Sequence, residues 1–254
     1  MITRMCSALV LCGLSALVSA AEVNGELAWA KRVTLSVPVS GIVTEVSVRP
    51  GEAVAAGQSL LGLDTREVQA RVAQANSAVK KLELHRAEAE REWERAQELF
   101  DRTVLSEREL QLAEIGLNDA DAAYQAARTE RVAAEVALEC HNLKAPFAAW
   151  VLAVPVAPGQ AIINAQQAVP LVTLAAREQM RARATVDAAQ AAALKTEVAV
   201  AVRVGEQRFD ARVVHIGLEP IGSQRPAQYL VEVEFNVPAD VQLRAGQPAT
   251  LELP

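Results

Sequence analysis

Cysteine, histidine and methionine are scarce in this chain of 254 residues, with three of each. Such side chains hold soft metal ions, and because the three histidines (His85, His141 and His215) lie far apart, we expect no local metal site. Aromatic residues make up only 4% of the chain, which favours close packing of small side chains. The net charge of -6 has the wrong sign for nucleic-acid phosphates, so nucleic acid is not an expected partner.

The N-terminal segment has the pattern of a secretory signal. Arg4 precedes an uncharged stretch from Met5 to Ala21, and Val18-Ser19-Ala20 offers the small side chains of a cleavage site. The apolar part is shorter than the roughly 20 residues of a membrane-spanning helix. We therefore expect residues 1–20 to be a cleaved signal peptide.

This cleavage bears on the cysteines. It removes Cys6 and Cys12 and leaves Cys140, which then has no disulfide partner within the chain and is expected to pack in a helix. Cys12 follows Leu11, whereas a lipoprotein signal has a small residue there, so lipidation is the less favoured alternative.

Two segments that lie 108 positions apart repeat one pattern. Each copy has a proline, a strand of alternating valines, a Pro-Gly turn and a second strand. We expect two β-hairpin halves that fold on each other and bury both valine faces. The aligned pairs are Pro38 with Pro146, Val46 with Val154, Val48 with Val156, Pro50 with Pro158, Gly51 with Gly159, and Val54 with Ile162.

Between the two copies, the apolar period changes to alternating steps of three and four residues, which is typical of a coiled-coil seam. Two such seams of similar length predict an antiparallel coiled-coil hairpin about 50 Å long. The first seam is Val68, Val72, Ala75, Val79, Leu82, Arg86, Ala89, Trp93, Ala96 and Phe100. The second is Leu110, Ala113, Leu117, Ala120, Tyr124, Ala127, Arg131, Ala134 and Leu138.

Capping patterns mark where these helices begin. Asp64 with Glu67, and Ser106 with Glu109, have the spacing of a capping box, so each pair is expected to begin a helix. The bend then falls at residues 101–105. No glycine or proline occurs from residue 66 to 115, which is consistent with an unbroken first helix.

Short β-rich runs follow residue 175, and a small closed barrel would leave none of their edges exposed. The expected strands are Met180–Val186, Val198–Val204, Phe209–Ile216, Tyr229–Phe235 and Ala249–Leu253, with a short helix over Asp187–Leu194. The predicted fold class is α+β. The predicted domains are a split lipoyl-like β-sandwich (21–64 and 142–176), the helical hairpin (65–141) and the barrel (177–254).

Local motifs in both halves and the barrel carry a family resemblance over nearly all of the mature chain. They are Ser40-Gly41-Ile42-Val43, Val48-Arg49-Pro50-Gly51, Gly57-Gln58-Ser59-Leu60, Leu143-Lys144-Ala145-Pro146-Phe147, Pro158-Gly159-Gln160 and Leu243-Arg244-Ala245-Gly246-Gln247. With the split sandwich and hairpin, they resemble the periplasmic adaptor (membrane fusion protein) family, HlyD and RND types, of tripartite efflux systems.

The resemblance implies a non-enzymatic periplasmic protein, associated with the inner membrane through its transporter and without a cofactor. Its implied partners are an inner-membrane transporter (an RND or ABC permease), a TolC-type outer-membrane channel and further copies of itself in a ring, by resemblance a hexamer. Adaptors that engage such channels carry an arginine, a leucine and a serine at the hairpin bend. Arg95, Leu99 and Ser106 match that spacing and are the implied channel-binding residues.

Two features depart from the family pattern. Ala149 stands where the family's second half has a turn glycine, so we expect a local adjustment of that strand. The sequence also ends at Pro254, where many adaptors of RND pumps continue into a membrane-proximal domain, so that domain is expected to be absent.

Four alternatives remain. A lipoyl or biotinyl carrier would need a modified lysine between the halves, where this chain has its helices; an adduct on Lys80 or Lys81 would indicate that function. A hydrolase would need a Gly-x-Ser-x-Gly or His-Glu-x-x-His motif, and neither is found. An adaptor of type I (ABC) secretion, or a structural coiled coil without a channel partner, fits the same helical pattern.

Overall fold

The computed structural model describes residues 21–164, 167–222, 226–238 and 241–254, so the predicted signal peptide lies outside the described residues. The chain divides into two compact units. One contains residues up to Lys31 together with Arg177–Pro254, and the other is Arg32–Ala176. Within the described ranges, no helix is both long and apolar enough to span a bilayer.

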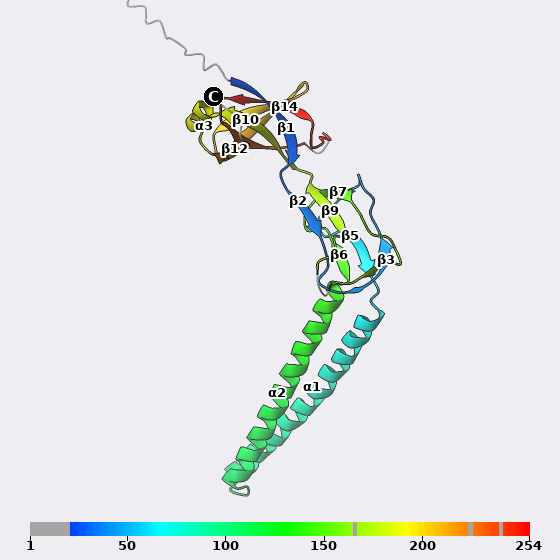
Figure 1. Ribbon diagram of the computed structural model, residues 1–254. Coiled ribbons are helices and arrows are strands. Elements are labelled where there is room, and N and C mark those ends of the chain that lie inside the picture. Colours follow the sequence, from blue (N-terminus) through cyan, green and yellow to red (C-terminus); the bar gives the residue numbers. More distant parts are fainter. Residues whose placement is uncertain (1–20, 165–166, 223–225, 239–240) are drawn as a thin grey trace, which may run out of the picture. The chain divides into compact units, whose positions relative to one another are not determined.

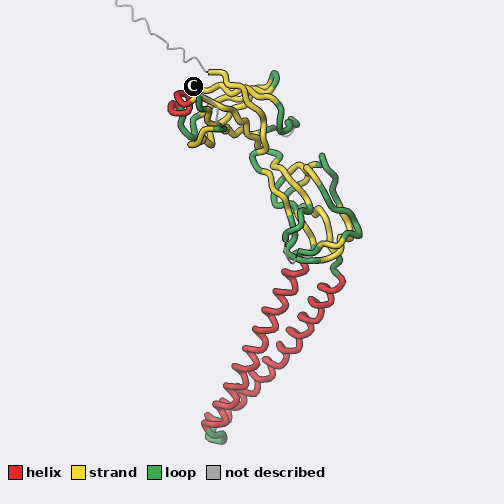
Figure 2. The backbone as a smooth tube through the Cα atoms, viewed as in Figure 1, coloured by secondary structure: helices red, strands yellow, loops and turns green. Residues whose placement is uncertain are grey.

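The first unit is a closed barrel of six strands from the described chain, all joined by antiparallel pairing (Figures 1 and 2). Its core contains Leu27, Met180, Val202 and Leu251, each almost fully buried. The predicted strands after residue 175 and the short helix are confirmed. In order around the barrel, the strands are β1 (Ala21–Trp29), β10 (Gln179–Asp187), β13 (Gln228–Asn236), β12 (Gln207–Pro220), β11 (Ala199–Val204) and β14 (Pro248–Leu253), and the helix is α3 (Ala188–Ala193).

The structure corrects one predicted boundary, because β1 belongs to the barrel and not to the sandwich. β1 pairs with β10 on one side and with β14 on the other. Without it, both neighbouring strands would expose unpaired N–H and C=O groups along one edge. Gly25 lies in the middle of β1, where an added Cβ would come within 2.2 Å of the Arg183 carbonyl oxygen.

The second unit contains two four-stranded sheets that share one apolar core, including Val43, Leu60, Val151 and Leu174. One sheet has the order β2 (Arg32–Leu35), β9 (Val172–Ala176), β7 (Ala149–Ala153) and β4 (Ala53–Val54). The other has the order β6 (Asn142–Lys144), β5 (Ser59–Leu63), β3 (Gly41–Val46) and β8 (Ala161–Ile162). The predicted β-sandwich is therefore present.

The two halves exchange backbone hydrogen bonds in a reciprocal pattern that confirms the sequence repeat. Gly51 and Gly159 both adopt positive φ, at 89° and 87°, as the predicted Pro-Gly turns require. Each glycine and the residue after it bond to the other half. The four bonds are Gly51 N–H to Val151 O (2.8 Å), Gly159 N–H to Val43 O (2.7 Å), Val151 N–H to Glu52 O (2.9 Å) and Val43 N–H to Gln160 O (2.9 Å).

The missing turn glycine does not disturb the strand pairing at its position. Ala149 pairs with Val54, just as the equivalent Gly41 pairs with Ile162 in the other half. The Ala149 side chain is fully buried, so the core accepts its methyl group. The irregularity in the pairing of β7 with β9 falls later, beyond Val151.

Two long helices, α1 (Arg66–Asp101) and α2 (Glu107–Glu139), are inserted between β5 and β6. They are joined by a short turn and run back side by side, each chiefly contacting the other (Figure 1). The predicted seam positions are buried or half-buried, with one exception. Phe100, the last position predicted in α1, is 37% exposed because the chain turns there.

The reciprocal turns give a first testable prediction. Gly51→Ala and Gly159→Ala should each lower the free energy of unfolding by about 1 to 2 kcal/mol, since alanine is strained at positive φ. The same change at the exposed helical Gly116 should raise it by about 1 kcal/mol, because alanine favours the helix. Urea denaturation measures all three variants, and clearly unequal costs at the two turns would contradict their equivalence.

Candidate functional site

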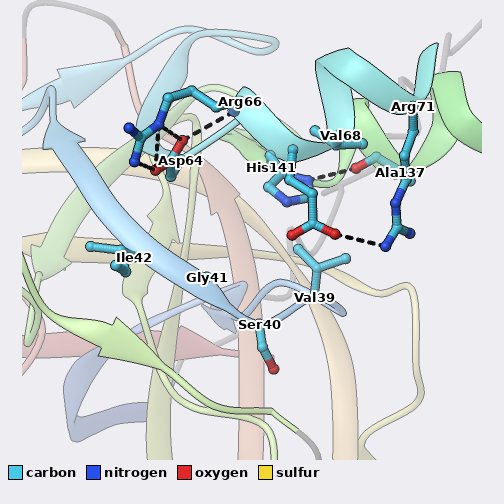
Figure 3. Close-up of a pocket in the computed structure, with 11 residues that line it drawn as sticks. Val39, Ser40, Gly41, Ile42, Asp64, Arg66, Val68, Arg71, Ala137 and His141 are labelled. Atoms are coloured by element: carbon cyan, nitrogen blue, oxygen red, sulfur yellow. Dashed lines mark hydrogen bonds and ion pairs between the residues drawn. The ribbon is translucent and has the colours of Figure 1, made fainter. Parts of the chain in front are cut away.

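The base of the helical pair is fixed to the sandwich by backbone hydrogen bonds. Asp64 N–H donates to the Ile42 carbonyl at 2.9 Å where α1 begins, and Leu63 N–H donates to the His141 carbonyl at 2.8 Å where α2 ends. A pocket of about 620 Å³ lies at this junction, between β3 and the first turns of α1 (Figure 3). These bonds therefore fix where the two helices begin and end on the sandwich, and we call this junction the root of the helices.

The polar groups of this pocket bond mainly to each other (Figure 3). Arg66 Nη2 contacts Asp64 at 2.5 Å, Arg71 contacts Glu67 at 2.7 Å, and His141 Nδ1 lies 2.7 Å from the Ala137 carbonyl oxygen. The hydrogen bonds from the Arg66 side chain and backbone lower the pKa of Asp64 to about 2. At pH values above the ordinary pKa of aspartate, this pairing stabilises the root of the helices. The stabilisation is lost as the pH falls through the lowered pKa of Asp64, at about 2.

The predicted capping box at Asp64 is wrong. The N-cap residue of α1 is Thr65, whose side chain makes no capping bond. The Asp64 carboxylate instead accepts from the Arg66 N–H at 3.0 Å, and the Glu67 carboxylate bonds Arg71 rather than the Asp64 backbone. Because α1 begins one residue later than predicted, Glu67 is not the third residue after the N-cap and cannot complete a capping box.

A polar layer interrupts the apolar seam near its middle. The Arg86 guanidinium lies 2.7 Å from an Asp121 carboxylate oxygen on the opposite helix and 5.9 Å from the ring centre of Tyr124. Arg128 lies over the same ring at 5.7 Å. Because this ion pair crosses between the helices, it favours the alignment that places Arg86 opposite Asp121.

The tip of the helical pair holds a strained residue. Thr103 N–H donates to the Phe100 carbonyl at 2.8 Å, and Val104 N–H to the Leu99 carbonyl at 2.9 Å. This is the Schellman arrangement that ends many helices, and it places Thr103 at φ 58°, where glycine is usual. Nothing in the sequence indicates a positive φ at a threonine. Backbone strain of this kind is concentrated at functional sites.

The predicted capping box at Ser106 is confirmed. Its hydroxyl accepts from the Glu109 N–H at 3.3 Å, and the Glu109 carboxylate accepts from the Ser106 N–H at 3.0 Å and the Ser106 hydroxyl at 2.6 Å. The two bonds that Ser106 donates hold the pKa of Glu109 below its ordinary value. α2 therefore begins at a fixed residue directly after the turn.

The three predicted tip residues differ in exposure. Arg95 is exposed on α1, Leu99 is only half-buried, and the Ser106 hydroxyl is already bonded within the cap. Sequence reasoning missed Val104, which is 72% exposed in the turn itself. The exposure of Val104 could have been predicted from its position in the expected bend, between the two seams. The tip thus presents a cation and an apolar side chain to solvent.

Other candidate groups lie apart from the tip. Cys140, predicted to pack in the helix, is the C-cap residue of α2 and only partly exposed. In the part of the chain that the structure describes, no three His, Cys, Asp or Glu side chains lie close enough together to hold a metal ion.

The strained turn gives a second prediction. Thr103→Gly should raise the free energy of unfolding by about 1 kcal/mol, because glycine adopts positive φ without a Cβ clash. Thr129→Gly, on the exposed middle of α2, is the matched control and should lower it by a few tenths of a kcal/mol. Urea denaturation followed by circular dichroism compares them, and a loss of stability in Thr103→Gly would contradict the strain.

The cap at Ser106 gives a third prediction, measured by NMR titration of the Glu109 carboxyl group. In Ser106→Ala, the pKa of Glu109 should rise toward its ordinary value of 4.5, because the hydroxyl no longer donates to the carboxylate. In the native chain, this bond stabilises the fold above about pH 4.5, and the stabilisation is lost as the pH falls through the lowered pKa. An unchanged Glu109 pKa in the variant would show that the cap does not form.

The fold of this chain is similar to that of several solved structures. The membrane fusion protein Spr0693 from Streptococcus pneumoniae R6 is 16% identical, with a TM-score of 0.69 over 92% of this chain and 99% of that chain. A MacA-MexA chimera with the Pseudomonas aeruginosa MexA α-hairpin domain is 19% identical, with a TM-score of 0.66 over 92% and 80%. MacA from Actinobacillus actinomycetemcomitans is 17% identical, with a TM-score of 0.62 over 93% and 79%.

These likenesses show a shared fold. A search of curated proteins gave no match. The family model described as a CzcB-like barrel-sandwich hybrid domain matches residues 31–173, which is more than half of the chain and includes both sandwich halves and both helices. The chain therefore belongs to the family with the CzcB-like barrel-sandwich hybrid domain.

Proposed function

We propose that this chain is a non-enzymatic periplasmic adaptor that links an inner-membrane transporter, of the RND or ABC class, to a TolC-type outer-membrane channel for the export of small molecules. Family membership and the fold shared with a membrane fusion protein support this function. The observation that carries the proposal is the helical pair, whose tip exposes Arg95 and Val104 far from the sandwich core.

The length of the helices suits a linking role. The 36 residues of α1 extend about 54 Å at 1.5 Å per residue. The seam spacing is that of a coiled coil, and the polar layer at Arg86 and Asp121 favours one register of the pair. We propose that the pair is a stiff antiparallel coiled coil that holds its tip at a fixed distance from the transporter.

The tip has the chemistry of a docking surface. An exposed arginine can donate several hydrogen bonds to carbonyl or carboxylate groups of a channel, and an exposed valine can be buried against it. Leu99 helps to hold Val104 in this position, because the Leu99 carbonyl accepts a hydrogen bond from the Val104 N–H in the Schellman turn. Ser106 fixes the start of α2 through its cap.

Self-assembly belongs to the same proposal. One tip presents few groups, so its contact with a channel is weak, whereas several tips held in one ring bind together with much higher affinity. We propose a ring of adaptors, by family resemblance a hexamer. Residues 1–20 are the cleaved signal that directs each copy to the periplasm.

Substitutions at the tip test the proposal. Arg95→Asp and Val104→Asp should abolish export in cells that carry the chain together with a transporter and an outer-membrane channel with which the native chain supports export, because each places a carboxylate where the channel docks. Leu99→Asp should do the same, although it also removes a half-buried side chain. Export is measured as substrate accumulation, with the adaptor level in the periplasm determined in parallel.

The control variants make the same kinds of change within α1, away from the tip. Leu84→Asp replaces a leucine that is 66% exposed, and Lys81→Asp replaces an exposed cation. Both should leave export unchanged. Normal export in Arg95→Asp and Val104→Asp, at normal protein levels, would refute docking through the tip.

A further inference from the structure

The last part of β12 carries an exposed leucine at a place where its pairing with β13 is irregular. Ile216 pairs with Val231 and Pro220 pairs with Tyr229, so four steps along β12 correspond to two steps along β13. A bulge of this kind interrupts the regular alternation of a strand and redirects its side chains. Here it leaves Leu218 94% exposed, the highest value among the large apolar side chains of the described residues.

Ordered contacts hold the bulge on both sides. Beyond it the Ile221 N–H donates to the Gln228 carbonyl at 2.7 Å, so the two strands are joined again. Within it Gly217 lies so close to β13 that an added Cβ would come 3.3 Å from the N and O atoms of Leu230. Ile221 is itself 44% exposed. We call Leu218 and Ile221 the barrel-end patch.

The barrel-end patch is exceptional within its unit. In the described part of the barrel unit, all other large apolar side chains are buried or half-buried. A single exposed leucine is common on protein surfaces and needs no explanation. Two large apolar side chains that a bulge exposes together, on a barrel that otherwise covers such groups, indicate a contact with another molecule.

The patch lies at the end of the barrel that the chain connections leave free. Both connections to the second unit leave the barrel where Trp29 of β1 pairs with Met180 of β10. Tyr229, the partner of Pro220, also pairs with Val186 near the other end of β10. The barrel therefore has one end joined to the sandwich by the chain and an opposite end that carries the patch.

The charges beside the patch disfavour a lipid surface. Glu219 is exposed between Leu218 and Ile221, and Asp187, also exposed, pairs with Gln228 at the end of β10. Insertion of Leu218 into a bilayer would bring these carboxylates to its surface, where anionic lipids repel them and the apolar layer excludes them. A protein surface can bury the leucine and leave both carboxylates in water.

The barrel of a second copy offers no matching apolar site. Its own barrel-end patch is the one group of prominently exposed large apolar side chains in the described part of that unit. Contact between two such patches would pair the copies about a two-fold axis. A ring of equivalent copies instead needs two different surfaces that fit each other.

We propose that the barrel-end patch docks on the periplasmic surface of the inner-membrane transporter, with Leu218 buried in an apolar pocket of that protein. This inference rests on the proposed function, which requires a contact with the transporter separate from the tip that binds the channel. A cation or N–H group at the rim of the pocket would pair with Glu219. Each patch is small, so the copies of the ring bind together.

Binding of the purified chain to the transporter tests the inference. The probe is a transporter with which the native chain supports export, held in a lipid nanodisc, and empty nanodiscs of the same lipids are measured in parallel. Leu218→Asp should weaken binding by about tenfold or more, because it replaces the buried side chain with a charge. Leu218→Met should bind within about twofold of the native chain, because it stays apolar and similar in volume.

The matched control is Gln207→Asp, which adds the same carboxylate at an exposed position at the other end of β12. It should leave the dissociation constant unchanged. Both aspartate variants should unfold at the urea concentration of the native chain, since each replaces an exposed side chain. Any loss of binding in Leu218→Asp then reflects the lost contact and not a damaged barrel.

Photocrosslinking in cells identifies what covers the patch. With p-benzoylphenylalanine in place of Leu218, ultraviolet light should link the chain to the tagged transporter, whereas the same amino acid in place of Gln207 should not. A stronger link to a second copy of the chain, or no link to any protein, would overturn the inference.

The binding measurements separate this inference from the proposed function. Equal affinity of the native chain and Leu218→Asp would overturn docking through the barrel-end patch alone, as would equal binding to empty and loaded nanodiscs. Failure of the native chain to support export with any transporter would overturn the proposed function and this inference together. The tip variants concern only the contact with the channel.

Discussion

The reciprocal exchange of backbone hydrogen bonds between the two halves of the sandwich is the interaction on which the second unit depends. The turn glycines Gly51 and Gly159 each donate to a strand of the opposite half, which accepts and returns the bond. Neither half can complete its sheets alone, and the two are separated in sequence by both long helices. The sandwich therefore closes around its own insertion and fixes where the helices start and end.

Regular patterns in the sequence predict much of this structure. The repeat at Pro50-Gly51 and Pro158-Gly159 indicates the paired halves, since a Pro-Gly turn dictates its own dihedral angles. The alternating three-and-four spacing of the helices identifies the buried seam position by position, as far as Ala96. Both signals are local or strictly periodic, so the residues that carry them can be found without knowledge of the tertiary fold.

The features that sequence reasoning missed depend on contacts between distant segments or on competition between neighbours. β1 completes the barrel by pairing with strands more than 150 positions away, and its own pattern fits either domain equally well. Asp64 lies one residue before the N-cap of α1 and accepts from both the backbone N–H and the guanidinium of Arg66, so it makes no capping box with Glu67. At the tip, the turn geometry determines that Val104 is more exposed than Leu99, and Thr103 takes a conformation that its residue type does not favour.

The root of the helices has a further consequence for how such proteins can diverge. β5 and β6 pair directly where α1 begins and α2 ends, with Gly62 opposite Asn142, so the sandwich closes without help from the residues between them. A matched gain or loss of seven residues in each helix would keep the seam in phase and change the reach by about 10 Å. The length of the helical pair can therefore change in whole heptads, while the sandwich that carries it keeps the same strands and the same closing contacts.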